Sequence, residues 1–135
     1  ILRVLSRDDL KLEELGIGFV AFSPLANGFL TAVYNSHAQF EKPGDYRSMM
    51  PQFSDEGIEE NKEFILWIKL LAEEKKATPA QISLAWMSAK KPYIVPIPGT
   101  RKVSRLEENM KASEIKLTKD EVKAIDEMLD NIQKK

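Results

Sequence analysis

The stretch "TPAQISLAWMSAKKPYIVPIPGTRKVSRLEEN", residues 78–109, contains the signals of a helix, a strand and a second helix in succession. Thr78 is a predicted N-cap, Pro79 suits the first helical turn, and Gln81 completes a capping box with Thr78. The apolar positions that follow recur at helical spacing and predict a helix whose inner face comprises Ile82, Ala85, Trp86 and Ala89.

A short apolar run, "YIVPI" at residues 93–97, predicts a strand directly after this helix. Pro96 has no backbone N–H, so the hydrogen-bonded ladder of the strand is expected to end early. A further helix is predicted over roughly residues 103–112, because three apolar residues recur at helical spacing: Val103, Leu106 and Met110.

Upstream of this stretch, residues 8–15 predict a short helix that Gly16 closes at its C-terminal end. The run "GFVAFS", residues 18–23, is apolar and aromatic and predicts a buried strand. From about residue 24 to residue 57, glycine, proline, asparagine and serine are scattered along the chain and predict a long irregular loop. A loop of that length inside a compact domain is usually functional or disordered.

Two more helices are expected on either side of the opening stretch. One covers about residues 58–76, and its apolar face consists of Phe64, Ile68 and Leu71, widened by Trp67. The other is C-terminal, because Thr118 and Glu121 form a second capping box. Its apolar stripe consists of Val122, Ile125, Leu129 and Ile132.

Strands that alternate with helices indicate parallel pairing of the strands, with the helices in the crossover connections. Two parallel strands by themselves leave the edges and faces of a sheet without cover. We therefore expect residues 1–135 to form a single partial domain of the α/β class, with about two parallel strands and four to five helices.

The composition excludes several classes of function. The chain has 135 residues, of which 43% are hydrophobic and 30% charged, as in one soluble domain. Its net charge of -1 gives no overall field that would attract nucleic acid or an anionic membrane. Without cysteine, disulfides and thiolate metal sites are excluded, and a reducing cytoplasm is the expected location. The opening "ILRVL" is too short for a signal peptide or a membrane span.

Three cations, Arg101, Lys102 and Arg105, lie where the helix after the second strand begins. A helix N-terminus already presents free N–H groups and partial positive charge, so these cations gain nothing from the helix dipole. A phosphate held between them would account for the arrangement, because Arg105 could donate two parallel hydrogen bonds to its oxygens. The alternative is a solvated basic helix start with an ordinary capping turn.

A second loop, "FSPLANGFLT" at residues 22–31, also follows a predicted strand. It carries a hydroxyl at Ser23, a rigid turn at Pro24 and a flexible Gly28. In (β/α)8 barrels a phosphate site commonly forms after strands seven and eight, so two such loops at neighbouring strand ends could hold one phosphate-containing ligand. The alternative is an ordinary strand-to-loop turn.

Taken together, these motifs give the chain a family resemblance. Three stretches resemble the C-terminal portion of an aldo/keto reductase: "GIGFVAFSPLANGFLT" (residues 16–31), "DYRSMMPQFSDEGIEEN" (residues 45–61) and residues 78–126. The similarity runs from about residue 8 to residue 132 and is strongest to the bacterial and plant-type branch. It implies the C-terminal part of an NADP-dependent (β/α)8 barrel, incomplete as a barrel.

The resemblance implies a set of residues that bind the cofactor NADP(H). Phe22 takes the place of an aromatic residue, usually Tyr, that stacks on the nicotinamide. The residues that match the loop around the pyrophosphate are Ser23, Pro24, Leu25, Asn27 and Gly28. Those that match the segment beside the adenosine phosphate are Ile97, Pro98, Gly99, Thr100 and Arg101. Arg105 matches the cation on the 2′-phosphate, while Glu108 and Asn109 match the pair that holds adenine.

The resemblance also implies catalysis by a Tyr acid with a supporting Lys, Asp and His, all from the first half of the barrel. No segment of this chain resembles those strands, so we predict no catalytic residue and no metal ligand here. Tyr34, Tyr46 and Tyr93 lie in other contexts. His37 is expected to be solvated, and Asp45 with Arg47 to form a local ion pair in the loop rather than a catalytic pair.

We accordingly expect a segment of an aldo/keto reductase that binds the cofactor, in an enzyme that reduces aldehydes or ketones, and we expect the chain alone to be inactive. Its predicted partners are a small carbonyl substrate in the intact enzyme and either a missing N-terminal half or further copies of itself. No nucleic-acid or membrane partner is expected. Two alternatives remain open: a truncated remnant that only binds dinucleotide weakly, and a self-associating structural protein.

Overall fold

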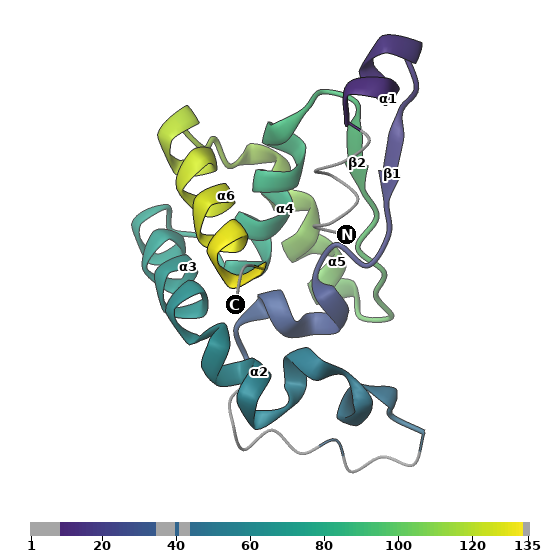
Figure 1. The fold of residues 1–135 in the computed structure, drawn as a ribbon. Coiled ribbons are helices and arrows are strands. Elements are labelled where there is room, and N and C mark those ends of the chain that lie inside the picture. Colours follow the sequence, from purple (N-terminus) through teal and green to yellow (C-terminus); the bar gives the residue numbers. More distant parts are fainter. Residues whose placement is uncertain (1–8, 35–39, 41–43, 134–135) are drawn as a thin grey trace.

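The computed structural model describes residues 9–34, 40 and 44–133, and side chains of residues 11–34, 40 and 44–131. The helices and strands follow one another in this order: α1 (Asp9–Leu15), β1 (Phe19–Ala21), α2 (Asp55–Glu60), α3 (Lys62–Glu74), α4 (Pro79–Lys90), β2 (Ile94–Pro96), α5 (Val103–Met110) and α6 (Lys119–Gln133). Short 3-10 helices lie between them: η1 (Ala26–Thr31), η2 (Tyr46–Met49), η3 (Pro51–Phe53) and η4 (Lys111–Glu114). Figure 1 shows their arrangement.

The two strands form a parallel sheet, as the alternation of strands and helices predicts. Phe19 pairs with Ile94 and Ala21 with Pro96. The N–H of Ile97 donates to the carbonyl oxygen of Ala21 at 3.0 Å, just beyond the paired residues. Each strand has three residues, fewer than predicted, because Pro96 cannot donate to the ladder and the chain turns away after Ala21.

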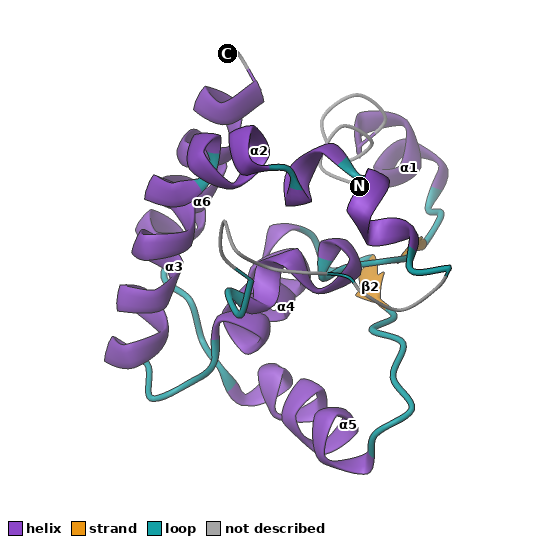
Figure 2. Cartoon of the chain, turned by 90° about the horizontal axis from the view of Figure 1, so that it is seen from below, coloured by secondary structure: helices purple, strands orange, loops and turns teal. Residues whose placement is uncertain are grey.

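Helix α4 lies at the centre of the molecule, between the sheet on one side and α3 with α6 on the other (Figures 1 and 2). Every residue from position 80 to position 87 is buried, so α4 is covered all round and not only along the predicted inner face. The prediction for Ala89 is wrong, since this residue is exposed. Ala89 lies in the last turn of α4, just before the chain leaves the helix in an extended conformation at Lys91.

The buried core joins α4 to the residues predicted on the two helices beside it. Phe64, Ile68 and Leu71 of α3 are buried, as are Ile125 and Leu129 of α6. Trp67 and Val122 are half-buried at the edge of this core, in agreement with their predicted places on the apolar faces of their helices. The side chain of Ile132 lies outside the described residues. The two helix starts carry both hydrogen bonds of the predicted capping boxes.

The predicted helix over residues 58–76 is two helices, α2 and α3, that meet at Asn61. The side-chain amide of Asn61 donates to the carbonyl oxygen of Gly57 at 2.6 Å and so competes with the regular helical hydrogen bond. Helix α2 also begins earlier than predicted, because the hydroxyl of Ser54 accepts the N–H of Gly57 as an N-cap. The segment predicted as one long irregular loop therefore contains three 3-10 helices and the start of α2.

Among the residues that the structure describes, none covers one face of the sheet and one face of α5. The prediction of a fully buried first strand is wrong, because only alternate residues face α4. Ala21 and Ile94 are buried, but Val20 is 59% exposed and Val95 54% exposed. The predicted stripe of α5 is also exposed and consists of Val103, Leu106 and Met110. The uncovered side chains of the sheet and of α5, namely Val20, Val95, Val103, Leu106 and Met110, are together called the open apolar face.

Among the described residues, no helix combines the length and the apolar character that crossing a membrane requires.

Candidate functional site

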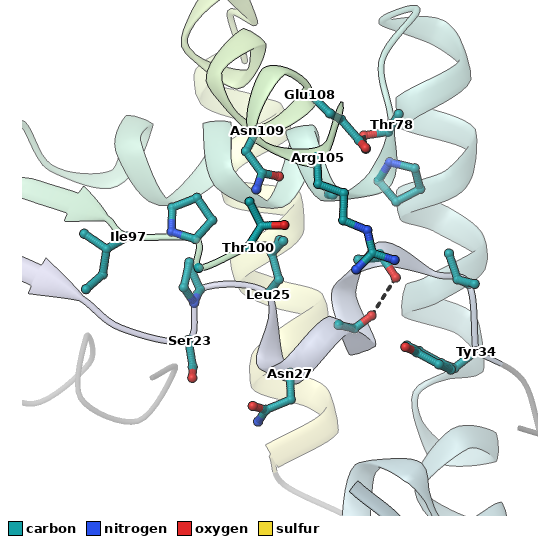
Figure 3. Close-up of a pocket in the computed structure, with 18 of the residues that line it drawn as sticks. Ser23, Leu25, Asn27, Tyr34, Thr78, Ile97, Thr100, Arg105, Glu108 and Asn109 are labelled. Atoms are coloured by element: carbon teal, nitrogen blue, oxygen red, sulfur yellow. Dashed lines mark hydrogen bonds between the residues drawn. The ribbon is translucent and has the colours of Figure 1, made fainter. Parts of the chain in front are cut away.

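A cavity of about 770 Å³ opens where both strands end (Figure 3). Its walls come from the loop after β1 with η1, the segment between β2 and α5, the inner side of α5 and the N-terminus of α4. Thirteen of the predicted site residues line it: Phe22, Ser23, Pro24, Leu25, Asn27, Gly28, Ile97, Pro98, Gly99, Thr100, Arg105, Glu108 and Asn109. Two loops far apart in sequence thus converge on one cavity because parallel strands bring their carboxyl ends to the same edge.

The three predicted cations do not all reach this cavity. Arg105 lines it, whereas Arg101 is exposed and is not among the lining residues, and neither is Lys102. Lys102 is the N-cap of α5, so Arg105 comes one turn into the helix, on the same side as Glu108 and Asn109. Arg105 is therefore the cation that faces the cavity, because Arg101 and Lys102 precede α5 and only the inner side of that helix lines the cavity.

The loop after β1 is tightly coiled. Ser23, Ala26, Asn27 and Gly28 all have positive φ, of 48°, 48°, 58° and 96° respectively. The first three are not glycine, and a positive φ costs each of them about 1 kcal/mol or more. The hydroxyl of Thr31 closes the turn by donating to the carbonyl oxygen of Gly28 at 2.6 Å. Backbone strain of this kind is concentrated at ligand sites, which supports a binding role for the loop.

Phe22 provides an aromatic surface at the strand end. The residue directly follows β1, lines the cavity and is 68% exposed. A large ring with that exposure gains little from the core, so its face is available for stacking on a planar ligand.

Arg105 is the electrostatic centre of the cavity. Figure 3 shows its side chain reaching from α5 toward the turn that carries Asn27. Among the ion pairs of the described residues, none involves Arg105. Thr78, Pro79 and Ala80, at the N-terminus of α4, line the same cavity and add the partial positive charge of a helix start. Arg105 suits its part of the cavity to an anion, whereas the start of α4 already donates to the carboxylate of Glu108 through Thr78.

Sequence reasoning missed seven lining residues: Thr31, Val33, Tyr34, Arg47, Thr78, Pro79 and Ala80. The predicted pair of Asp45 and Arg47 is confirmed as a local ion pair, and its hydrogen bonding is bidentate. Nε of Arg47 donates to Oδ1 of Asp45 at 2.8 Å and Nη2 donates to Oδ2 at 2.5 Å. The hydrogen bond with Asp45 raises the pKa of Arg47, which therefore stays charged. The sequence signal for this ion pair was the spacing of its two residues, since Asp45 and Arg47 are two positions apart.

Arg47 also ties the loop to the cavity wall. Its Nη1 donates to the phenol oxygen of Tyr34 at 2.5 Å, and its guanidinium lies 4.6 Å from the ring centre of Phe40. Nearby, the phenol of Tyr46 donates to Oδ1 of Asn27 at 2.9 Å. Because its charge is already matched by Asp45, Arg47 holds the loop in place, and Arg105 is left as the lining cation without a carboxylate partner among the described residues.

The remaining candidates lie elsewhere. Tyr93 precedes β2, at the opposite end of the strand from the cavity, and its carbonyl oxygen accepts the N–H of Phe19 at 2.8 Å. His37 lies outside the described residues. Over the part of the chain that the structure describes, no group of three or more His, Asp or Glu residues could hold a metal ion.

Comparison with known proteins decides the family. The sequence model of the aldo/keto reductase family matches residues 10–130. The chain belongs to this family. The aldo-keto reductase str7 of Strobilurus tenacellus is 44% identical over 112 residues, which are 83% of this chain and 33% of str7. The aldo-keto reductase yakc of Schizosaccharomyces pombe, whose name specifies NADP(+), is 41% identical over 120 residues, which are 89% of this chain and 35% of yakc.

Solved structures of aldo/keto reductases share the fold. A glycerol dehydrogenase of Gluconobacter oxydans matches with a TM-score of 0.78 and 25% identity, over 89% of this chain and 36% of that protein. A thermostable aldo-keto reductase in complex with the inhibitor epalrestat matches with a TM-score of 0.62 and 30% identity, over 93% of this chain and 35% of that protein. These relatives are (β/α)8 barrels, and this aldo/keto reductase chain spans about a third of their length. Its described residues contain two parallel strands and form no closed barrel.

Proposed function

We propose that the chain is the segment of an NADP(H)-dependent aldo/keto reductase that holds the adenosine and pyrophosphate of the cofactor. The observation that carries this proposal is the position of Arg105. Its guanidinium has no carboxylate partner among the described residues, and it shares one cavity with an exposed aromatic ring, Phe22, and with the coiled loop after β1.

The cavity fits an extended dinucleotide phosphate. Its volume of about 770 Å³ lies within the range of small-molecule and cofactor sites. Gly99 has no atom within 4 Å of the position where a side chain would begin, so the backbone there is open to close approach by a ligand. The N-terminus of α4 and Arg105 supply positive charge, while Glu108 and Asn109 supply hydrogen-bond acceptors on the next turn of α5.

The family resemblance implies a role for each residue, and the chemistry of its side chain suits that role. Phe22 would stack on the nicotinamide ring, and the loop from Ser23 to Gly28 would surround the pyrophosphate. Arg105 would donate two hydrogen bonds to the 2′-phosphate, and Glu108 with Asn109 would hold adenine. When bound, NADPH supplies the hydride that reduces the carbonyl carbon of an aldehyde or ketone.

The carbonyl substrate and the proton donor belong to the part of the proposal that concerns the intact enzyme. Reduction of a carbonyl needs an acid within reach of its oxygen, and we assign that role to no residue of this chain. The name of yakc, which specifies NADP(+), supports the choice of cofactor.

A titration of the purified chain with NADPH, followed by the fluorescence of the nicotinamide, tests the proposal. We expect saturable binding in the micromolar to millimolar range, and weaker binding of NADH because it lacks the 2′-phosphate that Arg105 would hold. An absence of NADPH binding at millimolar concentration would refute the proposal. In the same preparation we expect no oxidation of NADPH by a generic aromatic aldehyde.

A second candidate function, a self-associating structural protein, is supported by the open apolar face. Its side chains need cover, either from the rest of a barrel or from a second copy. The two functions are separable, because self-association would occur without any dinucleotide.

A further inference from the structure

The capping box of α4 makes a contact that capping alone does not require. The hydroxyl of Thr78 donates to Oε1 of Glu108 at 2.6 Å, across 30 residues of sequence. The side-chain amide of Gln81 donates to the backbone carbonyl oxygen of Glu108 at 2.8 Å. Figure 3 shows the side chains of Thr78 and Glu108 pointing toward one another at the rim of the cavity. Two residues of α4 therefore hold one residue of α5.

Each donor and acceptor in this contact has one defined hydrogen-bond partner. The Thr78 hydroxyl has a single proton, which it gives to Glu108, and its oxygen accepts the N–H of Gln81 at 3.3 Å. The amide oxygen of Gln81 accepts the N–H of Thr78 at 2.9 Å, which leaves its NH2 group to donate to Glu108. Gln81 is only 8% exposed, so this orientation is fixed.

The capping box of α6 shows what capping requires by itself. There the third residue is Glu121, whose carboxylate accepts the N–H of Thr118 at 2.7 Å, as the amide oxygen of Gln81 does in α4. A carboxylate serves that purpose as well as an amide, but it cannot donate. The glutamine at position 81 is therefore explained by its bond to the carbonyl oxygen of Glu108, beyond its role in the cap.

We propose that Thr78 and Gln81 are positioning residues that fix the carboxylate of Glu108 so that it selects an amino-bearing purine. This inference rests on the proposed function, in which Glu108 meets adenine. With one oxygen held by Thr78, the other is left to accept from an exocyclic amino group, and less side-chain freedom is lost on binding. A purine with a carbonyl in that position would place an acceptor against an acceptor and is rejected.

The test compares NADPH with its hypoxanthine analogue, deamino-NADPH, which carries a carbonyl in place of the amino group. We expect the unaltered chain to bind NADPH about 10-fold or more tightly than the analogue. Thr78→Val removes the donor and should weaken NADPH binding by about 3- to 10-fold, with little effect on the analogue. The ratio of the two affinities should fall accordingly, while Thr78→Ser, which keeps the hydroxyl, should preserve it.

Two further variants separate positioning from a structural role. Gln81→Glu keeps the acceptor for the cap but loses the donor to Glu108, so it should lower the ratio in a chain that remains capped. Thr118→Val removes the corresponding cap hydroxyl of α6, away from the cavity, and should lower the melting temperature without changing the ratio.

The possible outcomes are distinct. If the unaltered chain does not bind NADPH, the proposed function fails and the inference fails with it. If it binds NADPH but does not discriminate against the analogue, the proposed function stands and the inference is overturned. The inference is also overturned if discrimination persists in Gln81→Glu and in Thr78→Val. Should Thr78→Val not fold, the comparison of Thr78→Ser with Gln81→Glu decides.

Discussion

Arg101 and Arg105 lie four positions apart, yet they have different surroundings. Both follow β2 and both are arginines, but only Arg105 lies within α5 and lines the cavity. The period of the helix places Arg105 on the same side as Asn109, while Arg101 precedes the helix and is exposed. The pair therefore provides a matched test of which cation meets a phosphate.

We predict that Arg105→Ala weakens NADPH binding by about 10- to 100-fold, the value expected for one charge-assisted contact with phosphate. NADH, which has no 2′-phosphate, should lose far less affinity. Fluorescence titrations with both dinucleotides measure the two changes. Arg101→Ala removes the same charge outside the cavity and serves as the control.

The assignment of Arg105 would be contradicted by an equal loss for NADPH and NADH, or by a larger loss in Arg101→Ala. At this scale, most of the residues predicted to bind the cofactor line one cavity, because the two loops that carry them are continuous in sequence. It did not predict Arg47 or Thr78 as lining residues. Their place in the cavity depends on how the loop before α2 and the start of α4 pack against η1, which no local pattern records.

At the scale of elements, the start of α6 links a capping box to an ion pair. Nζ of Lys75, next to the end of α3, lies 2.6 Å from Oε1 of Glu121. Partial burial raises the pKa of the Glu121 carboxyl, but its hydrogen bonds and ion pair with Lys75 and the N–H of Thr118 together lower the pKa below its ordinary value. Folding therefore favours the ionised form of Glu121.

The lowered pKa predicts the direction of a pH dependence. The stabilising contribution of Glu121 is fully present above the pKa of the unfolded chain, about 4.5, and is lost as the pH falls through the lower pKa of the folded chain. Glu121→Gln keeps the cap, as Gln81 does in α4, but not the charge. We expect it to lower the free energy of unfolding by about 1 kcal/mol at pH 7, with the difference vanishing in acid.

Urea denaturation at a series of pH values measures this difference. Glu127→Gln is the matched control, since Glu127 lies on the same helix and pairs with Lys123 in a mostly exposed contact. It should change stability by no more than a few tenths of a kcal/mol at any pH. A Glu121→Gln chain that remained as stable as the unaltered one at pH 7 would refute the role of the pair.

The helices with strong local signals were the elements that sequence predicted best. Both capping boxes involve residues three apart, so their hydrogen bonds follow from the order of residues alone. The break at Asn61 was not predicted, because the apolar pattern continues through it and a single side-chain amide decides the interruption. The exposure of Ala89 was missed for another reason: burial depends on which elements pack around a residue in the tertiary structure.

The whole molecule has a covered side and an uncovered one. Helices α3 and α6 cover α4 on the side away from the sheet, whereas the open apolar face has no cover among the described residues (Figure 1). Val103 is 72% exposed and Met110 is 67% exposed. Exposed apolar side chains on two elements favour association with another protein surface.

We predict that the chain by itself associates as its concentration rises, which sedimentation velocity would detect. Val103→Glu places a charge on the open apolar face and should shift the equilibrium toward the monomer by about 10-fold or more, since a buried unpaired charge costs at least 1–2 kcal/mol. Ser104→Glu adds the same charge to the next residue of α5, off the apolar stripe, and is the control.

Sedimentation as a well-folded monomer over the whole concentration range would contradict this prediction. It would also remove the self-associating protein as an alternative function, while leaving the proposal for the dinucleotide unaffected. The two proposals for the molecule as a whole are thus tested independently.

The sequence by itself determined the order of helices and strands, the parallel pairing, the helix starts, the family and the two loops that line the cavity. These properties depend on residues within a few positions of one another, or on continuous motifs. Only the tertiary structure decided which cation faces the cavity, which residues hold Glu108 and which apolar side chains remain exposed. The physical reason is distance along the chain: Thr78 and Glu108 are 30 residues apart, and their contact exists only because α4 and α5 pack together.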